Sequence, residues 1–437
     1  MVLTRPRAAP ARVPPALGGR IGTLLDRVPR AERRLLLAAV VLGVLARVAY
    51  VLLTHDAPLK GDQLEYHAQG VFFHDGHAWW SRTPFGMPHP SLWKAPLYPL
   101  WVGALYSVGG VHPGWVKAVQ VLCGVAVIVL SWMLARRLFG PRVATVVAFV
   151  VALYPMTFQF EELLYSEAIA TPILLVVLVL AWTRAPTPRR AALTGLALGV
   201  AMLTRPSFGT LGAAILVAWI AAAGWRRGIG LSVVAALVAA LVIAPWTIRN
   251  HHVDGGFVPI SIQDAALYGV FNDEAAHDPV HPWAWRPVPR GYLQILRQPT
   301  SDHGFRSRLQ KLARAYISDH PTSVFKAFWW NGLNRTFDLR TPPSAQYEAP
   351  FEGRIGWFSK LGAWCYLFVG LAALAGLWRH RARRGLVLAV LALFLATAVA
   401  YTGDGGTRYR APLEPLIAVL AVAAFASVRI RPASAPV

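Results

Sequence analysis

Ten apolar runs divide this chain, and they constrain its fold more than any other feature of the sequence. A helix needs ~20 apolar residues to cross the hydrocarbon core, and a helix pairs its own backbone groups inside lipid. The chain is 55% hydrophobic and 15% charged, and its mean hydropathy is +0.44. These values exclude an ordinary soluble domain and predict an all-α polytopic membrane protein with about ten spans. The runs are 35–53, 115–135, 143–158, 163–182, 191–203, 208–223, 229–246, 357–378, 386–401 and 411–426.

The net charge of +22 is distributed as a membrane protein distributes it. Lys and Arg gather in short clusters between the apolar runs, as the positive-inside rule predicts, so we expect no nucleic-acid partner. Cys123 and Cys365 both fall inside apolar runs. We therefore predict neither a disulfide framework nor a cysteine metal site.

The basic clusters also predict the orientation of the chain. With a cytoplasmic N-terminus, the connections "ARRLFGPR", "RAPTPRR", "GWRRG", "LWRHRARRG" and "VRIRP" all fall on the cytoplasmic side. The apolar stretch 95–110 is either a full crossing or a segment that stays on one side of the membrane. A full crossing would invert every later loop and place the arginine clusters outside. We interpret it as a juxtamembrane or re-entrant segment on the outer side, since Pro96 and Pro99 are rare in a simple span. The protein is thus expected in the cytoplasmic membrane, with its large loops on the outer face.

The first apolar run lacks a small-residue cleavage site, so we expect a retained helix rather than a signal peptide. The stretch 304–330 has the amphipathic spacing of a helix lying at the membrane interface.

This topology divides the chain into five parts. The parts are a basic cytoplasmic tail (1–34), an N-terminal transmembrane bundle (35–250) with the first outer loop (54–114), an outer-face loop with the interfacial helix (251–356), C-terminal transmembrane helices (357–428) and a cytoplasmic tail (429–437).

One carboxylate lies inside a predicted span. Glu167 is roughly one turn into the fourth run, where an ionisable side chain costs up to ~2.5 to 3.5 kcal/mol and usually has a role or a partner. A catalytic or acceptor-site role and a structural pairing with an arginine both fit its position. Glu161 and Glu162 precede it, and we interpret them as loop carboxylates.

Several basic residues lie at outer span ends, against the positive-inside trend. They are Arg205, Arg249, Arg408 and Arg410, and Lys94, just before the stretch 95–110, could add a fifth cation. A phosphate held between helix ends would supply their counter-charge through charge-assisted hydrogen bonds. The alternatives are lipid head groups, or pairing with Asp62, Glu167 and Asp404. As a set, the five favour a phosphate site.

The first outer loop holds the candidate general base. On a helix, Asp62, Glu65 and Tyr66 share one face, although a solvated face shows the same spacing. Asp62 follows the first span closely, where its carboxylate could accept a proton from an acceptor hydroxyl. Glu65 and Tyr66 are candidates for support of this site.

No cofactor is assigned from the sequence, although a divalent metal stays possible. The histidines at 74, 77, 251 and 252 permit a metal site on paper. They lack a tight ligand pattern, so we interpret them as solvated side chains.

Several motifs occur together in an order typical of one enzyme class. They are "GDQLEYHAQG", "KAPLYPLWVGALY", "ARRLFG", "LYSEA", "GLALGVAMLTRP", "APWTIRN" with "GGFVPIS", and "RYRAPLEPLIAVLAVAA". The chain from about residue 35 to 428 thereby resembles the bacterial family 39 glycosyltransferases. These belong to the GT-C class, together with the protein O-mannosyltransferases and the aminoarabinose transferases of lipid A.

The resemblance implies a function and assigns residues to it. Such enzymes take a sugar from a polyprenyl-phosphate carrier and pass it, with inversion, to an acceptor at the outer membrane face. By this resemblance Asp62 is the general base, Lys94 and Arg205 face the donor phosphate, and Glu167 is the acidic residue of the second outer turn. The mannosyltransferases have an adjacent Asp-Glu pair where this chain has Asp62-Gln63. We also expect no additional soluble C-terminal domain, which leaves acceptor choice to the two outer loops.

The residues and the resemblance predict one reaction. A base deprotonates the acceptor hydroxyl, the oxygen attacks the anomeric carbon, and the polyprenyl phosphate leaves, stabilised by basic residues. The expected partners are this donor, a glycan, lipid or protein acceptor, and membrane lipids. The alternative is a flippase or transporter for lipid-linked sugars, which should show internal repeats and polar residues at mid-membrane. We find no repeat, and a structural membrane protein has no need of inward carboxylates and arginines together.

Overall fold

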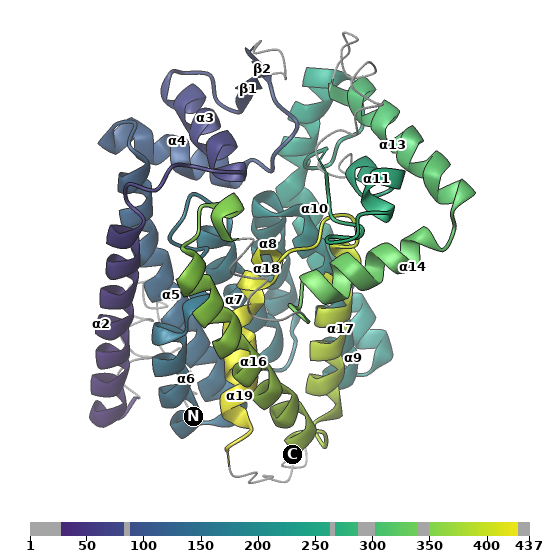
Figure 1. Cartoon of the computed structure of the whole chain (residues 1–437). Helices are drawn as coiled ribbons and strands as arrows, with labels where there is room; N and C mark the ends of the chain where they lie inside the picture. The colour runs from purple at the N-terminus through teal and green to yellow at the C-terminus, as the bar shows by residue number, and fades with distance from the viewer. Residues whose placement is uncertain (1–27, 83–87, 263–266, 287–301, 340–348, 427–437) are drawn as a thin grey trace, which may run out of the picture.

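The computed structural model describes residues 28–82, 88–262, 267–286, 302–339 and 349–426. Within these ranges every one of the ten apolar runs forms a helix, and the ten helices lie side by side as a bundle (Figure 1). The helices are α2 (Arg30–Leu53), α5 (Pro113–Phe139), α6 (Pro141–Leu153), α7 (Glu167–Trp182), α8 (Pro188–Thr204), α9 (Leu211–Ala223), α10 (Trp225–Asp254), α16 (Gly356–Arg379), α17 (Arg384–Ala400) and α19 (Glu414–Ala423). The all-α fold class is thereby confirmed.

Glycine makes two of the tight connections between neighbouring helices. Gly140 joins α5 to α6 with a φ of 99°, and Gly224 joins α9 to α10 with a φ of 80°. A residue with a Cβ is strained at these angles, whereas glycine adopts them readily. Pro141 then starts α6, where its missing N–H is not needed. The sequence Gly-Pro therefore ends one helix and starts the next in two residues.

The outer faces of the bundle are apolar. Leu237, Leu241 and Phe368 are 61%, 72% and 67% exposed, which is typical of side chains that face lipid. Among the described residues, five helices are long and apolar enough to cross a membrane: Arg30–Leu53, Pro113–Phe139, Pro206–Ala223, Trp225–Asp254 and Gly356–Arg379. The helices Pro141–Leu153, Glu167–Trp182 and Arg384–Ala400 are apolar but shorter. A membrane protein is therefore shown, and the number of ten spans stays a prediction.

Small residues allow the closest helix contacts. A Cβ added at Gly195 of α8 would lie 2.3 Å from the backbone oxygen of Ala235 in α10. A Cβ at Gly376 of α16 would lie 2.0 Å from the backbone oxygen of Leu420 in α19. Such close approach of backbones is how membrane helices gain packing energy without a hydrophobic driving force.

One end of the bundle carries extra elements, and we call it the cap end. Helices α3 (Asp62–His74) and α4 (Leu97–Gly109) pack together there (Figure 1). Two short strands, β1 (Trp80–Arg82) and β2 (Pro88–Pro90), pair antiparallel beside them, which the sequence did not predict. The 13 residues of α4 extend about 20 Å, too short to cross a hydrocarbon core of about 30 Å. Since α6 and α9, which belong to the ten apolar runs, are also 13 residues long, this length does not decide between the two interpretations of 95–110.

The long loop contributes a second set of helices to the cap end. It contains α11 (Asp273–Ala276), α13 (Asp302–Asp319), α14 (Ser323–Ala327), the π-helix Phe328–Arg335 and the 3-10 helix Ala349–Glu352. The expected single interfacial helix is therefore interrupted, and Pro321 lies in the break, where it removes a backbone donor. The Asn331 side chain of the π-helix donates to the backbone oxygens of Trp283 and Thr402, tying this loop to the turn after α17.

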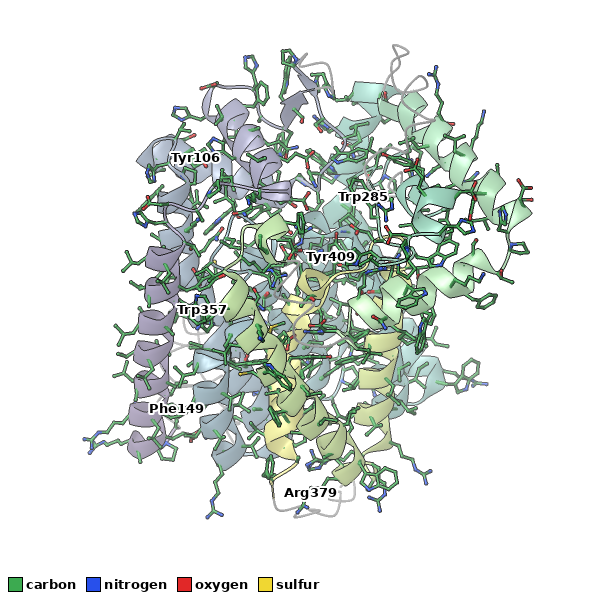
Figure 2. All side chains as sticks on the ribbon, in the orientation of Figure 1. Tyr106, Phe149, Trp285, Trp357, Arg379 and Tyr409 are labelled. Carbon is green, nitrogen blue, oxygen red and sulfur yellow. The ribbon has the colours of Figure 1, made fainter. Side chains whose placement is uncertain are left out.

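Short elements continue several bundle helices at the cap end. They are the 3-10 helices Pro155–Thr157, Pro206–Thr210 and Ala411–Leu413 and the one-turn helix α18 (Thr407–Arg410). The third run was expected to continue to residue 158, but α6 stops at Leu153 because Pro155 follows. Figure 2 shows Tyr409 of α18 towards the cap end, whereas Arg379, the last residue of α16, lies at the opposite end.

Candidate active site

Six charged side chains meet at the cap end and alternate in sign. We call them the ion-pair cluster: Glu65, Lys94, Asp62, Arg408, Glu167 and Arg205, in the order in which they contact one another. They come from α3, the loop before α4, α7, the end of α8 and α18, which are far apart in sequence. The cluster holds three acids and three bases, so its formal charge is zero.

Lys94 connects the two carboxylates of α3. Its Nζ lies 2.9 Å from Asp62 Oδ1 and 2.9 Å from Glu65 Oε2. The same ammonium group lies 5.5 Å from the centre of the Tyr66 ring, within the range of a cation–π contact. The three residues that share one helix face in the sequence therefore all contact Lys94.

Arg408 connects α3 to the bundle. Its Nη2 donates to Asp62 Oδ2 at 2.6 Å, and its Nε lies 3.2 Å from Glu167 Oε1. Arg205 donates to the same Glu167 oxygen. Both oxygens of Asp62 are thus bound by cations, and Glu167 forms ion pairs with two arginines.

Burial makes these contacts stronger than exposed ion pairs. Lys94, Arg205 and Arg408 are each less than 10% exposed and Glu167 is 1% exposed, whereas the Asp62 side chain keeps 28% of its surface exposed. Desolvation alone would raise the pKa of Asp62, but the charges and hydrogen bonds of Lys94 and Arg408 outweigh it and hold this pKa well below its usual range. Asp62 is therefore a carboxylate at every physiological pH.

Tyrosines surround the two arginines. The Arg408 guanidinium lies 4.5 Å from the ring centre of Tyr165 and 5.1 Å from that of Tyr409. Arg205 lies 5.8 Å from the Tyr401 ring and 5.2 Å from the Tyr409 ring. Sequence reasoning missed these tyrosines, although each stands within three residues of a charged residue in "LYSEA" or in "YTGDGGTRYR".

The turn before α3 and the contacts of Gln63 fix the position of Asp62. Gly61 has a φ of 56°, which a residue with a Cβ rarely adopts, and α3 begins directly after it. Gln63 is 1% exposed; its Oε1 accepts from the Leu164 N–H at 3.2 Å, and its Nε2 donates to the Glu352 backbone oxygen at 3.0 Å. An amide can donate and accept at once, whereas a carboxylate can only accept. The glutamine next to Asp62 therefore serves to fasten α3 to two other loops.

Two of the five predicted phosphate ligands have other partners. Arg249 donates to the Ser91 backbone oxygen at 2.8 Å and stacks on Trp246 at 4.7 Å. Arg410 is fully buried and donates to Glu414 at 2.6 Å. The structure thus brings together Lys94, Arg205 and Arg408 of this set, and it gives Arg249 and Arg410 contacts that fasten the fold.

Glu161 and Glu162 lie in the turn before α7, as expected of loop carboxylates, but they are not exposed. Both side chains are buried, and Arg47 of α2 lies 3.9 Å from Glu161 Oε2 and 3.6 Å from Glu162 Oε1. Gly124 of α5 leaves the space for Arg47, since a Cβ there would lie 2.2 Å from Arg47 Nε. The turn before α7 therefore folds inward onto a buried arginine that the sequence did not single out.

A metal finds no ready set of ligands in the described parts of the chain. No group of three or more His, Cys, Asp or Glu side chains in these ranges is close enough to hold one. The oxygens of Asp62 are already engaged by cations. His251 and His252 lie near the end of α10 with ring centres 6.3 Å apart.

Part of the chain matches a known protein family. Residues 90–248 match the sequence model of a family described as dolichyl-phosphate-mannose-protein mannosyltransferase. This range contains Lys94, Glu167 and Arg205 but neither Asp62 nor Arg408, and it is less than half of the chain. No curated protein sequence matches the chain significantly.

The decisive structural match is to a membrane glycosyltransferase. The crystal structure of Archaeoglobus fulgidus oligosaccharyltransferase, tethered with an acceptor peptide that contains the NVT sequon, aligns with a TM-score of 0.54 and 16% identity. The chain has a GT-C fold. The alignment covers 90% of this chain and 49% of that enzyme, so the chain spans about half the length of this GT-C relative. Apo ArnT from Cupriavidus metallidurans aligns with a TM-score of 0.40 and 17% identity over 83% of this chain and 76% of its own.

The resemblance that the motifs indicate is therefore confirmed at two levels. The sequence match covers residues 90–248, and the GT-C fold extends over most of the chain. At 16% identity the likeness concerns the fold, and it assigns neither the donor nor the acceptor nor the role of any single residue.

Proposed function

We propose that this protein is a glycosyltransferase that moves a sugar from a polyprenyl-phosphate donor to an acceptor hydroxyl, with inversion at the anomeric carbon. The observation that carries the proposal is the ion-pair cluster: three buried cations converge on Asp62 and Glu167 at one end of a GT-C bundle. The family matched by residues 90–248 has a dolichyl-phosphate-linked sugar in its description. Dolichol is a polyprenol, which supports this donor class.

The cluster suits a donor phosphate because its cations can change partners. In the structure each cation is paired with a carboxylate, so a phosphate must replace those contacts to bind. Lys94 and Arg408 lie on either side of Asp62, and their N–H groups can bind phosphate oxygens as well as carboxylate oxygens. Arg205 adds a third cation from α8. Together they would stabilise the charge left on the phosphate as the glycosidic bond breaks.

Donor binding would at the same time free the general base. When the phosphate takes Lys94 and Arg408, Asp62 loses the two partners that lower its pKa. Its oxygens are then available to accept the proton of an acceptor hydroxyl, while that oxygen attacks the anomeric carbon. Asp62 thereby becomes a competent base only in the donor complex. Glu65 would keep Lys94 positioned, and Glu167 would hold Arg205.

We further propose that the cap end faces the outside of the cytoplasmic membrane. The segments 136–142 and 379–384, at the opposite end, contain seven arginines and no carboxylate, as expected on the cytoplasmic side. The acceptor, whether glycan, lipid or protein, would then reach Asp62 from the side of α3 and the long loop.

A binding experiment tests the phosphate site. The probe is a short-chain polyprenyl monophosphate, which needs no knowledge of the sugar, added to the purified full-length protein. Changing Lys94, Arg205 or Arg408 to Gln should weaken binding, and double changes should be non-additive because the three act on one group. Arg249→Gln is the matched control, because it removes an arginine that contacts backbone oxygens instead. Unchanged affinity in all three variants would refute the site.

A second experiment separates transfer from transport. Lipid and glycan profiles of a strain lacking the gene should show an accumulated polyprenyl-linked sugar and a missing glycan. A flippase would instead move the lipid-linked sugar across the membrane of vesicles that contain the purified protein, with no transfer of the sugar to any acceptor. That outcome would replace the proposed activity with the alternative reading.

A further inference from the structure

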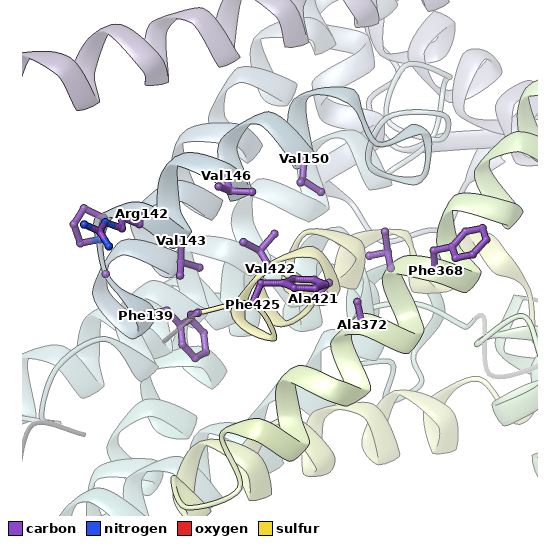
Figure 3. Close-up of a pocket in the computed structure, with 14 residues that line it drawn as sticks. Phe139, Arg142, Val143, Val146, Val150, Phe368, Ala372, Ala421, Val422 and Phe425 are labelled. Atoms are coloured by element: carbon purple, nitrogen blue, oxygen red, sulfur yellow. The ribbon is translucent and has the colours of Figure 1, made fainter. Parts of the chain in front are cut away.

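An apolar groove lies at the end of the bundle opposite the cap, far from the ion-pair cluster. It has a volume of about 870 Å³, within the range of roughly 300–1,000 Å³ that is usual for ligand sites. The first turns of α6, the middle of α16 and the end of α19 form its walls (Figure 3). All its lining residues except Arg142 are apolar or glycine.

The groove is polar at one end only. Figure 3 shows Arg142 at one end of the row of apolar side chains and Phe368 at the other. Arg142 is exposed and makes no hydrogen bond or ion pair with any described residue. From Pro141 to Val150, α6 advances about 14 Å, which is close to the half-thickness of a hydrocarbon core of about 30 Å. The groove therefore has the depth of one leaflet.

The surroundings of the groove select an anionic head group. Arg383 lies 5.4 Å from the ring centre of Phe139 in the wall, and Arg379 donates to the backbone oxygen of Ala426 at 2.9 Å. Each keeps further guanidinium N–H groups, since arginine has five. The adjoining segments 136–142 and 379–384 contain no carboxylate, and Glu32 of α2, which approaches the first segment, is paired with Arg136.

We propose that this groove binds one acyl chain of an anionic glycerophospholipid, with the lipid phosphate at Arg142, Arg379 and Arg383. The groove length fits a chain that starts at the membrane surface and ends near the bilayer centre. A polyprenyl donor with its phosphate at Lys94 would enter from the other leaflet. The inference is independent of the proposed transferase activity, because it uses no residue of the ion-pair cluster.

Native mass spectrometry of the full-length protein, released from mixed micelles of phosphatidylglycerol and phosphatidylcholine, tests the proposal. We expect preferential retention of phosphatidylglycerol. Arg142→Gln should reduce this retention about tenfold, the equivalent of about one charge-assisted contact. Arg226→Gln is the control, since it removes an exposed arginine of α10 that does not line the groove.

A second pair of variants tests the apolar part. Ala372→Trp fills the groove, whereas Leu371→Trp changes the neighbouring, 58% exposed side chain outside it. The first should abolish selective retention and the second should not, with thermal unfolding confirming that both proteins fold. Equal retention of the two lipids, or loss in both tryptophan variants alike, would overturn the proposal.

One competitor and one truncation test whether something else occupies the groove. Displacement of phosphatidylglycerol by short-chain polyprenyl monophosphate would assign the groove to the donor instead. Retention that appears only after removal of residues 427–437 would assign the groove to the chain's own C-terminal segment. Either result would refute the lipid site, and neither would affect the phosphate test at Lys94, Arg205 and Arg408.

Discussion

Replacing Asp62 by Asn should have two opposite effects, lower turnover and tighter donor binding. The amide keeps the size of the side chain but removes the basic oxygen, so transfer should fall by roughly two to four orders of magnitude. It also leaves Lys94 and Arg408 without the carboxylate that occupies them. A phosphate would then compete with one carboxylate fewer at each cation, since only Glu65 at Lys94 and Glu167 at Arg408 stay as partners.

The size of the affinity gain follows from the two contacts. Hydrogen bonds to charged groups contribute about 1.5 to 3 kcal/mol each in proteins. The Asp62 side chain is 28% exposed, so solvent screens both, and we take about 1.4 kcal/mol in total as the cost of displacing them. This corresponds to about tenfold tighter binding of a polyprenyl monophosphate. Sequence reasoning alone would predict unchanged donor affinity, because it does not show that Asp62 holds these cations.

Two measurements on the same pair of proteins, one with purified protein and one in cells, check this prediction. One is equilibrium binding of short-chain polyprenyl monophosphate to wild type and Asp62→Asn, and the other is recovery of the missing glycan in a deletion strain that expresses each protein. Glu65→Gln is the control, since Glu65 pairs with Lys94, whereas Asp62 pairs with both Lys94 and Arg408, so the control should change both readouts much less. Weaker phosphate binding in Asp62→Asn would refute the competition argument. Near-normal glycan recovery in Asp62→Asn, with loss in Glu65→Gln, would refute the assignment of the base.

Three further predictions concern stability and topology. Arg47→Met should lower the free energy of unfolding by about 3 to 5 kcal/mol, measured by thermal melting in detergent, because it leaves two buried glutamates without a cation; an unchanged melting temperature would contradict this. Burial raises the pKa of Asp404 to about 6, so the folded state binds more protons than the unfolded state between about pH 4 and pH 6, and stability should fall as the pH rises through this window. Asp404→Asn should flatten that part of the pH profile, and an identical profile would exclude Asp404 as its cause. Ser318→Cys should react with an impermeant thiol reagent in intact cells and Ala185→Cys only after permeabilisation; the reverse result would invert the topology.

The helices of the bundle were predictable because their signal is local. A run such as 357–378 carries enough apolar residues to require a helix in lipid, whatever the rest of the chain does. Helix α16, Gly356–Arg379, accordingly begins and ends within one residue of this run. Ends governed by proline were less predictable, as at Leu153 and Pro321, because a hydropathy pattern does not register the loss of a single backbone donor.

The types and positions of residues in the sequence predicted part of the site, but they did not predict which charged residues pair with one another. Arg205 and Arg408 stood out because cations are unusual at those span ends, Lys94 because it precedes the stretch 95–110, and Asp62 because it follows the first span. Whether a given arginine faces the cluster depends on how helices far apart in sequence pack. Arg408 reaches Asp62, whereas Arg410, two residues later, pairs with Glu414.

The sequence by itself determined that the chain is a helical membrane protein with charged residues gathered at particular helix ends, because hydrophobicity and charge act on each segment separately. Only the tertiary structure decided which charges neutralise one another. Glu161 and Glu162 are charged residues in a predicted loop, yet they are buried against Arg47. Asp62 and Glu167 share Arg408, since an ion pair depends on distances of a few ångströms between segments that the order of residues does not bring together.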